Sequence, residues 1–200
     1  MRRALQFITF SLAVLFVLSA AGAVSAQGTP KVDIFGGYSY MHANIVVSGS
    51  PINLNGASGS LAYNFNDWLG VVGDVGVYHQ GSITANDLSL TVSTYQVGPR
   101  VSLRRHHHLI PFGQVLIGAG HAGGTLYTSS LGGGLAPLGT SNGFVLTAGG
   151  GVDWKLNHTI GIRLLQAEYL YSQFENGGTH GNQQNNVRLS AGIVLSFGSH

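Results

Sequence analysis

The segment 187–197 alternates large apolar residues with small or polar ones along its whole length. The odd positions are apolar: Val187, Leu189, Ala191, Ile193, Leu195 and Phe197. Most of the even positions are small or polar: Arg188, Ser190, Gly192 and Ser196. Because successive side chains of a strand point to opposite faces, the pattern predicts a strand with one apolar and one polar face. Similar segments recur without amphipathic helices to cover them, so we expect the apolar faces to meet lipid, as in a membrane barrel.

The first 26 residues have the pattern of a secretory signal. Arg2 and Arg3 precede a mainly apolar stretch over 5–18, and Val24-Ser25-Ala26 forms a small-x-small cleavage site. The alternative is an uncleaved membrane anchor, which the short apolar stretch disfavours. The chain has no cysteine, which excludes a lipid-anchored lipoprotein. We therefore predict a signal peptide over 1–26 and a single barrel domain over 27–200.

The composition of the chain favours contact with lipid. Charged residues make up 8% of the chain, against about 25% in ordinary soluble domains. A soluble protein this poor in charge would expose large apolar patches and aggregate. Arg2 and Arg3 belong to the predicted signal, so basic and acidic residues balance in the remainder of the chain and indicate no nucleic-acid surface.

Eight segments of strand length follow the predicted signal. They are 31–41, 56–65, 69–79, 89–104, 109–121, 143–154, 159–173 and 187–197. Short connections (66–68, 105–108 and 155–158) alternate with longer ones that are rich in Gly, Ser, Thr and Asn (42–55, 80–88, 122–142 and 174–186). This alternation predicts an all-β fold, a single eight-stranded antiparallel up-and-down transmembrane β-barrel. Short turns and both termini would face the periplasm, and the last strand would close on the first.

The charged residues on the polar faces predict a network inside the barrel. Its members are Asp74, Arg100, Arg163, Glu168 and Arg188. Arg163 and Glu168 have opposite parity, so we expect a bulge near Leu164-Leu165 that turns both inward. Because buried charges must pair or stay hydrated, Arg100 and Arg188 should pair with Asp74 and Glu168. The network is either a gate on a narrow ion path or a structural plug, and the narrow interior of eight strands favours the plug.

Aromatic residues gather toward the ends of the predicted strands. This placement favours two interfacial belts over ordinary strand propensity. The belt residues are Tyr38, Tyr40, Tyr63, Phe65, Trp68, Tyr78, Trp154, Tyr169, Tyr171 and Phe197.

Several histidines and one glycine-rich segment could in principle form a metal, catalytic or phosphate-binding site. His106-His107-His108 lacks nearby acidic partners and follows two arginines, so a solvated turn is expected and no metal site. His79, His121 and His180 lie near the predicted loops, but no spacing of Ser, His and acid forms a triad. The glycine-rich segment 131–137 leads to no helix and carries no lysine, so it predicts an external loop, not a phosphate site. We expect no catalytic residue and no cofactor.

Several segments resemble one family of membrane proteins. They are Phe35-Gly36-Gly37-Tyr38, 149–153, Gln166-Ala167-Glu168-Tyr169 and 185–193. The chain resembles the OmpA-like, or outer membrane protein beta-barrel domain, group over nearly all of 27–200. The resemblance implies an eight-stranded barrel in a Gram-negative outer membrane, without catalytic residues. It also implies contact with outer-membrane lipid, lipopolysaccharide and the assembly machinery. Two departures are the missing C-terminal peptidoglycan-binding domain and the three residues beyond Phe197.

These observations leave three functions open. The first is a non-catalytic structural or surface-interaction barrel, with an unidentified extracellular ligand. The second is a low-conductance pore for small solutes, and the third is a lipid-modifying outer-membrane enzyme. The alternative fold is a soluble lipocalin-like barrel, which would require an apolar interior and a polar exterior.

Overall fold

The computed structural model describes residues 29–47, 50–81, 89–104, 108–128, 134–174 and 182–198. Eight β-strands make up nearly all of this part of the chain. They are β1 (Val32–Val47), β2 (Ser50–Asn64), β3 (Leu69–Gln80), β4 (Ser89–Ser102), β5 (Leu109–Thr128), β6 (Gly134–Lys155), β7 (Ile160–Phe174) and β8 (Asn182–Phe197). The described residues contain no helix long and apolar enough to cross a bilayer. The predicted signal peptide lies outside the described residues and stays a prediction.

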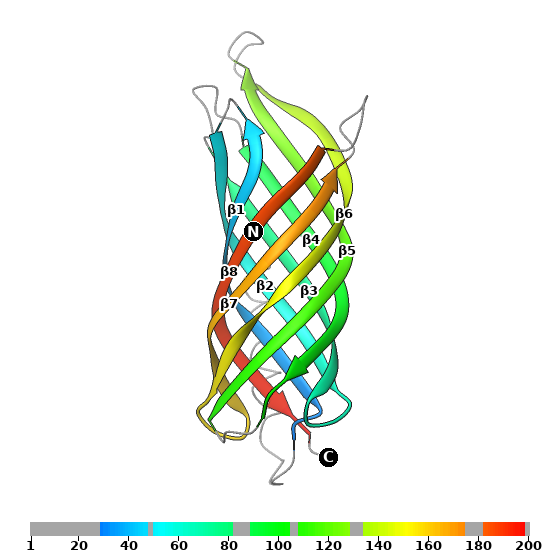
Figure 1. Cartoon of the computed structure of the whole chain (residues 1–200). Helices are drawn as coiled ribbons and strands as arrows, with labels where there is room; N and C mark the ends of the chain where they lie inside the picture. The colour runs from blue at the N-terminus through cyan, green and yellow to red at the C-terminus, as the bar shows by residue number, and fades with distance from the viewer. Residues whose placement is uncertain are drawn as a thin grey trace.

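Each strand pairs antiparallel with its neighbours in the chain, and β8 pairs with β1 to close the sheet. The closing ladder runs from Val32 opposite Phe197 to Ala43 opposite Asn186. β1 begins and β8 ends at the same end of the cylinder (Figure 1). We call this the turn end, because it also carries the short connections after β2, β4 and β6, and we call the opposite end the loop end. The predicted eight-stranded antiparallel barrel is confirmed.

An asparagine side chain stabilises two of the turn-end connections in the same way. The Asn66 side-chain oxygen accepts hydrogen bonds from the backbone N–H groups of Trp68 (3.0 Å) and Leu69 (2.8 Å). The Asn157 side-chain oxygen does the same for Thr159 (2.9 Å) and Ile160 (2.7 Å). These contacts satisfy the backbone donors that a sharp reversal leaves unpaired. The two short connections 66–68 and 155–158 therefore hold tight turns, as their sequences predict.

The strands at the loop end are longer than the sequence predicted. β1 extends to Val47 and β2 begins at Ser50, so most of the predicted connection 42–55 is paired backbone. β5 and β6 likewise continue into the predicted connection 122–142, and β8 into 174–186. The prediction of long loops there was wrong, because a neighbouring strand satisfies backbone hydrogen bonds whatever the side chains are. Their Gly, Ser and Asn content hides the strand signal in the sequence.

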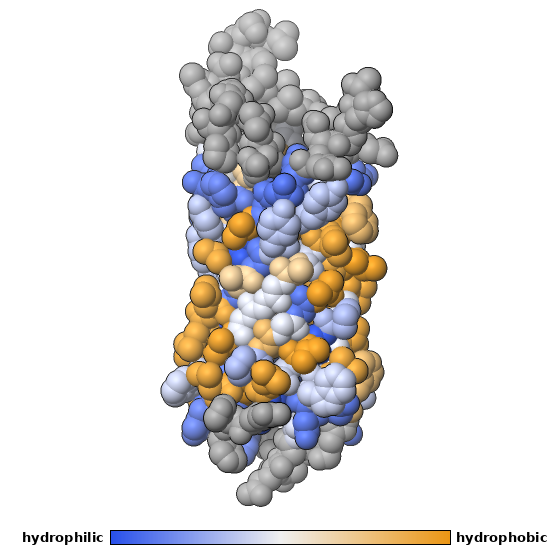
Figure 2. Space-filling view, in the orientation of Figure 1, coloured by the Kyte–Doolittle hydropathy of each residue, from blue (hydrophilic) through white to orange (hydrophobic). Residues whose placement is uncertain are grey.

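The two faces of the wall are oriented as the alternation predicts. Large apolar side chains point outward and stay more than half exposed, among them Leu61, Val77, Val97, Ile117 and Ile193. On the face drawn in Figure 2, hydrophobic residues gather over the middle and lower part of the barrel, below a hydrophilic zone. The inward side chains are buried and many of them are polar or charged. The lipocalin-like alternative, with a polar exterior, is therefore wrong.

β7 contains the predicted bulge. Val152 faces Leu165 and Asp153 faces Arg163, so Leu164 is an extra residue in the ladder with β6. Leu164 and Leu165 both point outward, each 52% exposed. The extra residue shifts the alternation of inward and outward side chains by one position. Arg163 and the later even positions of β7 therefore all point inward.

Candidate functional site

Arg188 of β8 is the centre of a buried ion-pair cluster in the middle of the barrel interior. Its Nε donates to Glu168 Oε2 of β7 at 2.6 Å, and its Nη1 donates to Asp74 Oδ1 of β3 at 2.8 Å. The same Nη1 lies 3.1 Å from the hydroxyl oxygen of Tyr78. Gln114 of β5 donates to the second oxygen of Glu168 at 2.8 Å. Arg188, Asp74 and Glu168 are all at most 3% exposed. The cluster therefore links four strands, β3, β5, β7 and β8, inside the barrel and away from solvent.

Asp153 of β6 forms a second cluster nearer the turn end. Arg163 donates two hydrogen bonds to Asp153, from Nε to Oδ1 at 2.7 Å and from Nη2 to Oδ2 at 3.1 Å. Arg100 of β4 donates from Nη2 to Asp153 Oδ2 at 3.1 Å. Both guanidinium groups also pack on the Phe112 ring, with centroid distances of 3.7 Å for Arg100 and 4.4 Å for Arg163. Stacking on an aromatic face helps to stabilise a desolvated guanidinium.

The predicted partners of Arg100 were wrong. We expected Arg100 to join Asp74 and Glu168, but it pairs with Asp153. The reason is the position of Arg100 along its strand. Asp74 lies opposite Gln96, four residues along β4 from Arg100, which is about 13 Å at roughly 3.3 Å per residue. Among the predicted network residues, the structure therefore brings Arg188, Asp74 and Glu168 together and joins Arg163 and Arg100 through Asp153.

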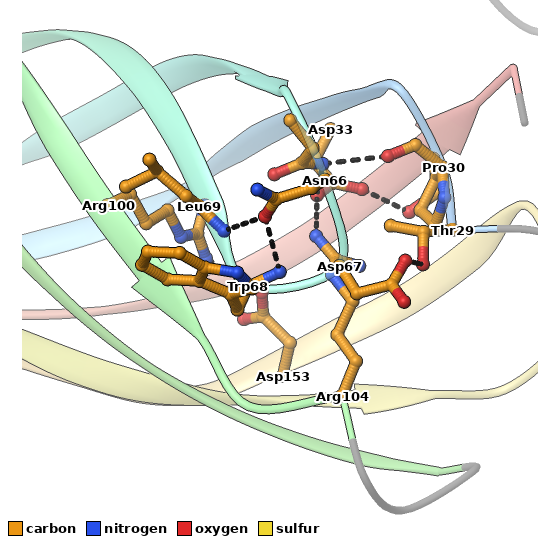
Figure 3. Close-up of polar contacts among 12 residues, drawn as sticks. Thr29, Pro30, Asp33, Asn66, Asp67, Trp68, Leu69, Arg100, Arg104 and Asp153 are labelled. Carbon is orange, nitrogen blue, oxygen red and sulfur yellow. Dashed lines mark hydrogen bonds and ion pairs between the residues drawn. The ribbon is translucent and has the colours of Figure 1, made fainter. Parts of the chain in front are cut away.

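Asp33 of β1 organises a third cluster, at the turn end, that the predicted network missed. Its Oδ2 accepts from Arg104 Nη2 (3.0 Å) and Asn64 Nδ2 (2.9 Å), and its Oδ1 accepts from Ser196 Oγ (2.6 Å). Figure 3 shows Asp33 and Arg104 in the same region of the turn end as Arg100 and Asp153. Asp33 has the parity of the polar face of its strand, and that signal could have placed it in the interior.

An apolar layer fills the interior toward the loop end. Its buried members pack together on the loop-end side of the Arg188 cluster: Met41, Ala43, Leu54, Tyr78, Val92, Val145 and Leu170. Sequence reasoning missed this layer, because it treated the inward face as uniformly polar. Tyr78 was wrongly assigned to an aromatic belt. It is fully buried, since its even position in β3 points inward, where its hydroxyl meets Arg188.

The other predicted belt residues lie on the outer face. Six of them are exposed: Tyr38, Tyr63, Phe65, Trp68, Trp154 and Tyr169. Three are partly buried: Tyr40, Tyr171 and Phe197. At the turn end the Tyr63 and Phe65 rings meet edge to face at 5.5 Å, and Trp154 stacks on His108 at 6.4 Å. Their role as lipid anchors stays a prediction.

The described histidines of the loop end contact single polar side chains. His79 Nδ1 lies 3.0 Å from Thr91 Oγ1, and His121 Nδ1 lies 2.6 Å from Asn142 Oδ1. The described part of the chain holds no group of three His, Asp or Glu side chains that could bind a metal ion. His106, His107 and His180 lie outside the described residues.

Comparison with known proteins agrees with this architecture. The family model described as "Outer membrane protein beta-barrel domain" matches residues 10–197. No curated protein sequence matches the chain. Ail, the attachment invasion locus protein of Yersinia pestis, is a similar solved structure with 17% identity and a TM-score of 0.60, the match covering 84% of this chain and 99% of that one.

Two further structures are similar at low identity. Neisserial surface protein A shares 18% identity with a TM-score of 0.57, and the match covers 86% of this chain and 100% of that one. OprG from Pseudomonas aeruginosa shares 12% identity with a TM-score of 0.54, covering 88% and 100%. At these identities the three structures show the fold alone. The family match over 10–197 carries the assignment: the chain belongs to the outer membrane protein beta-barrel domain family, and it is an eight-stranded barrel of the outer membrane.

Proposed function

We propose that the protein is a closed structural barrel that presents a polar surface outside the cell and neither conducts solutes nor catalyses a reaction. The filled interior is the observation that carries this proposal. Side chains cross the lumen between strands far apart in the ring: Arg104, two residues beyond β4, reaches Asp33 of β1, and Arg188 of β8 reaches Asp74 of β3. A permeating ion would have to break these buried contacts.

The apolar layer adds a second barrier above the ion pairs. Leu54, Val145 and Leu170 come from β2, β6 and β7 and are at most 1% exposed, so side chains from opposite walls meet in the interior. An ion loses its hydration shell in such a layer and gains no polar partner. The two layers together support a plug in place of a gate.

The loop end is built for contact with water and with extracellular partners. β5 and β6 are 20 and 22 residues long, whereas a tilted strand crosses a bilayer in about 9–11 residues. Beyond the apolar band the outward positions carry exposed polar side chains, which we call the polar collar: His42, Asn53, Asn55, His79, Thr91, His121, Asn142, Gln173 and Asn185. The loop-end parts of the strands would therefore extend beyond the membrane.

The lack of basic residues at the loop end limits the class of extracellular partner. Ail has been solved in complex with the heparin analogue sucrose octasulfate. Here the segments 42–55, 80–88, 122–142 and 174–186 contain no Lys or Arg. A polyanion would find no fixed positive charge to bind there. We therefore propose an uncharged or weakly charged partner, and no sulfated or phosphorylated polymer.

The lateral surface and the closing strand suggest the remaining partners. The band of exposed apolar side chains would contact outer-membrane lipid and the acyl part of lipopolysaccharide. Phe197, at the end of β8, would offer the terminal aromatic of the closing strand to the assembly machinery.

Conductance in a planar bilayer tests the closed lumen. Purified, folded protein should give no unitary current steps above those of a detergent blank. Reproducible steps of constant size would contradict the proposal and support the low-conductance pore. Folded protein should be verified in the same sample, by its faster migration on a detergent gel before boiling.

A lipid-modifying enzyme is the less supported alternative. All five acidic residues of the described chain are engaged away from the loop end. Asp33, Asp74, Asp153 and Glu168 are buried in the lumen, and Asp67 accepts a hydrogen bond from Thr29 at the turn end. None of them orients His79 or His121 as a general base requires. Altered lipid A or phospholipid species in a deletion strain, restored by the wild-type gene, would overturn this conclusion.

A further inference from the structure

A small cavity lies at the turn end of the lumen, between the Asp33 and Asp153 clusters. Its volume is about 10 Å³, and its charged lining residues are Asp33, Arg100, Arg104, Asp153 and Lys155. Ser102 and Ser196 also line it. A space of this size holds a single water molecule or an ion of similar size.

Both carboxylates around the cavity are already fully engaged. Asp33 accepts three hydrogen bonds, from Arg104, Asn64 and Ser196. Asp153 also accepts three, two from Arg163 and one from Arg100. Each carboxylate is therefore already paired with at least one guanidinium group.

The positive groups outnumber these two acids. Arg100, Arg104, Arg163 and Lys155 surround Asp33 and Asp153, which leaves an excess of two positive charges at this end of the lumen. No ion pair joins Lys155 to the described residues. Lys155 is half-buried, and an uncompensated charge in a partly desolvated site is stabilised when a counter-ion accompanies it.

Two buried donors lack an acceptor at the same place. The Nε groups of Arg100 and Arg104 have no hydrogen-bond partner among the described residues, and their side chains are 3% and 10% exposed. Both arginines line the cavity, and their other nitrogens hold Asp153 and Asp33 (Figure 3). The two arginines that line the cavity therefore each carry a buried donor without an acceptor among the described residues.

We infer that this cavity binds one small monovalent anion, of the size of chloride or bromide. The anion would accept hydrogen bonds from the arginine Nε groups and balance the charge of Lys155. The cavity excludes large organic anions by its volume. This inference is independent of the proposed surface role, since it concerns the opposite end of the barrel.

Halide-dependent stability of the full folded chain in detergent tests the inference. The melting temperature should rise in a saturable way when sodium bromide replaces sodium gluconate at constant ionic strength, because a ligand that binds only the folded state stabilises it. Crystals soaked in bromide should show an anomalous peak within hydrogen-bond distance of Arg100 Nε or Arg104 Nε. Equal melting temperatures in the two salts, or crystals without that peak, would overturn the inference.

Matched variants separate binding from general screening. Arg104→Gln should weaken the apparent bromide affinity by about tenfold, the order expected for losing one hydrogen bond to a charged group. Asp33 keeps Asn64 and Ser196 as donors in that variant. Lys31→Gln makes the same change of charge beside β1, outside the cavity lining, and should leave the bromide response unchanged. If Arg104→Gln fails to fold, Lys155→Gln replaces it with the same expected loss. A bromide response that is equal in the cavity variant and in Lys31→Gln would contradict a specific site.

Discussion

Replacing Arg188 by Met should destabilise the barrel strongly without changing its shape. The guanidinium is fully buried and holds two carboxylates at 2.6 and 2.8 Å. Methionine keeps much of the side-chain length but leaves Asp74 and Glu168 buried without their cation. Breaking a buried ion pair by removing one partner typically costs about 3–5 kcal/mol. We expect a loss of this order in the free energy of unfolding.

Urea unfolding in phospholipid vesicles measures this loss, with the folded fraction counted from heat-modifiable gel migration. Adding Asp74→Asn and Glu168→Gln to Arg188→Met should restore a large part of the stability, because the triple variant buries no unpaired charge. Arg104→Met is the graded control. It should cost less, since Asp33 retains Asn64 and Ser196 as donors.

The reasoning fails if Arg188→Met lowers the unfolding midpoint no more than Arg104→Met does. It also fails if Arg188→Met folds with unchanged stability and gains unitary conductance steps. That result would make Arg188 the gate of a pore and not part of a structural plug.

Two further predictions use matched changes of the wall itself. Gly98→Ala should reduce the folded fraction on a detergent gel, because a Cβ there would lie 1.9 Å from a carbonyl oxygen of β5. Gly73→Ala is the control and should fold normally, since no atom lies within 4 Å of the added carbon. Equal folding of the two variants would contradict the close approach of the strands at Gly98. Deleting Leu164 should leave a barrel that still migrates as a folded species, because it removes only the bulged residue. Deleting Ala167 should strongly reduce that species, because either Glu168 or Gln166 must then face lipid. Two equally folded deletions would contradict the assignment of the bulge.

The period of two predicts most of this fold from the sequence. Each strand contributes a face whose parity depends only on backbone geometry, so inward Arg188 and outward Ile193 follow from alternation alone. The bulge in β7 was predictable for the same reason. Arg163 and Glu168 could not both turn inward without an extra residue between them.

The contacts inside the lumen were predicted less well. Odd or even position in a strand tells whether a side chain points inward, but not how far along the barrel axis it lies. The position of Arg100 along the barrel axis depends on the register of β4 against its neighbours, so its pairing with Asp153 could not be read from the sequence. The apolar layer was missed because the inward face was treated as uniformly polar, although only Ala43 and Leu54 of its members lie in a predicted loop. Tyr78 belongs to this layer and has the parity that points inward.

The direction of the side chains in β8 can be measured directly, since the chain contains no cysteine. Single cysteines at each position of 187–197 would carry a nitroxide label in barrels reconstituted into lipid vesicles. Oxygen, which concentrates among acyl chains, should relax the labels at Leu189, Ala191 and Ile193 far more than those at Ser190 and Gly192. A water-soluble nickel chelate should reach none of the first three. An accessibility profile without a period of two, or with oxygen reaching the even positions instead, would contradict an apolar face turned to lipid.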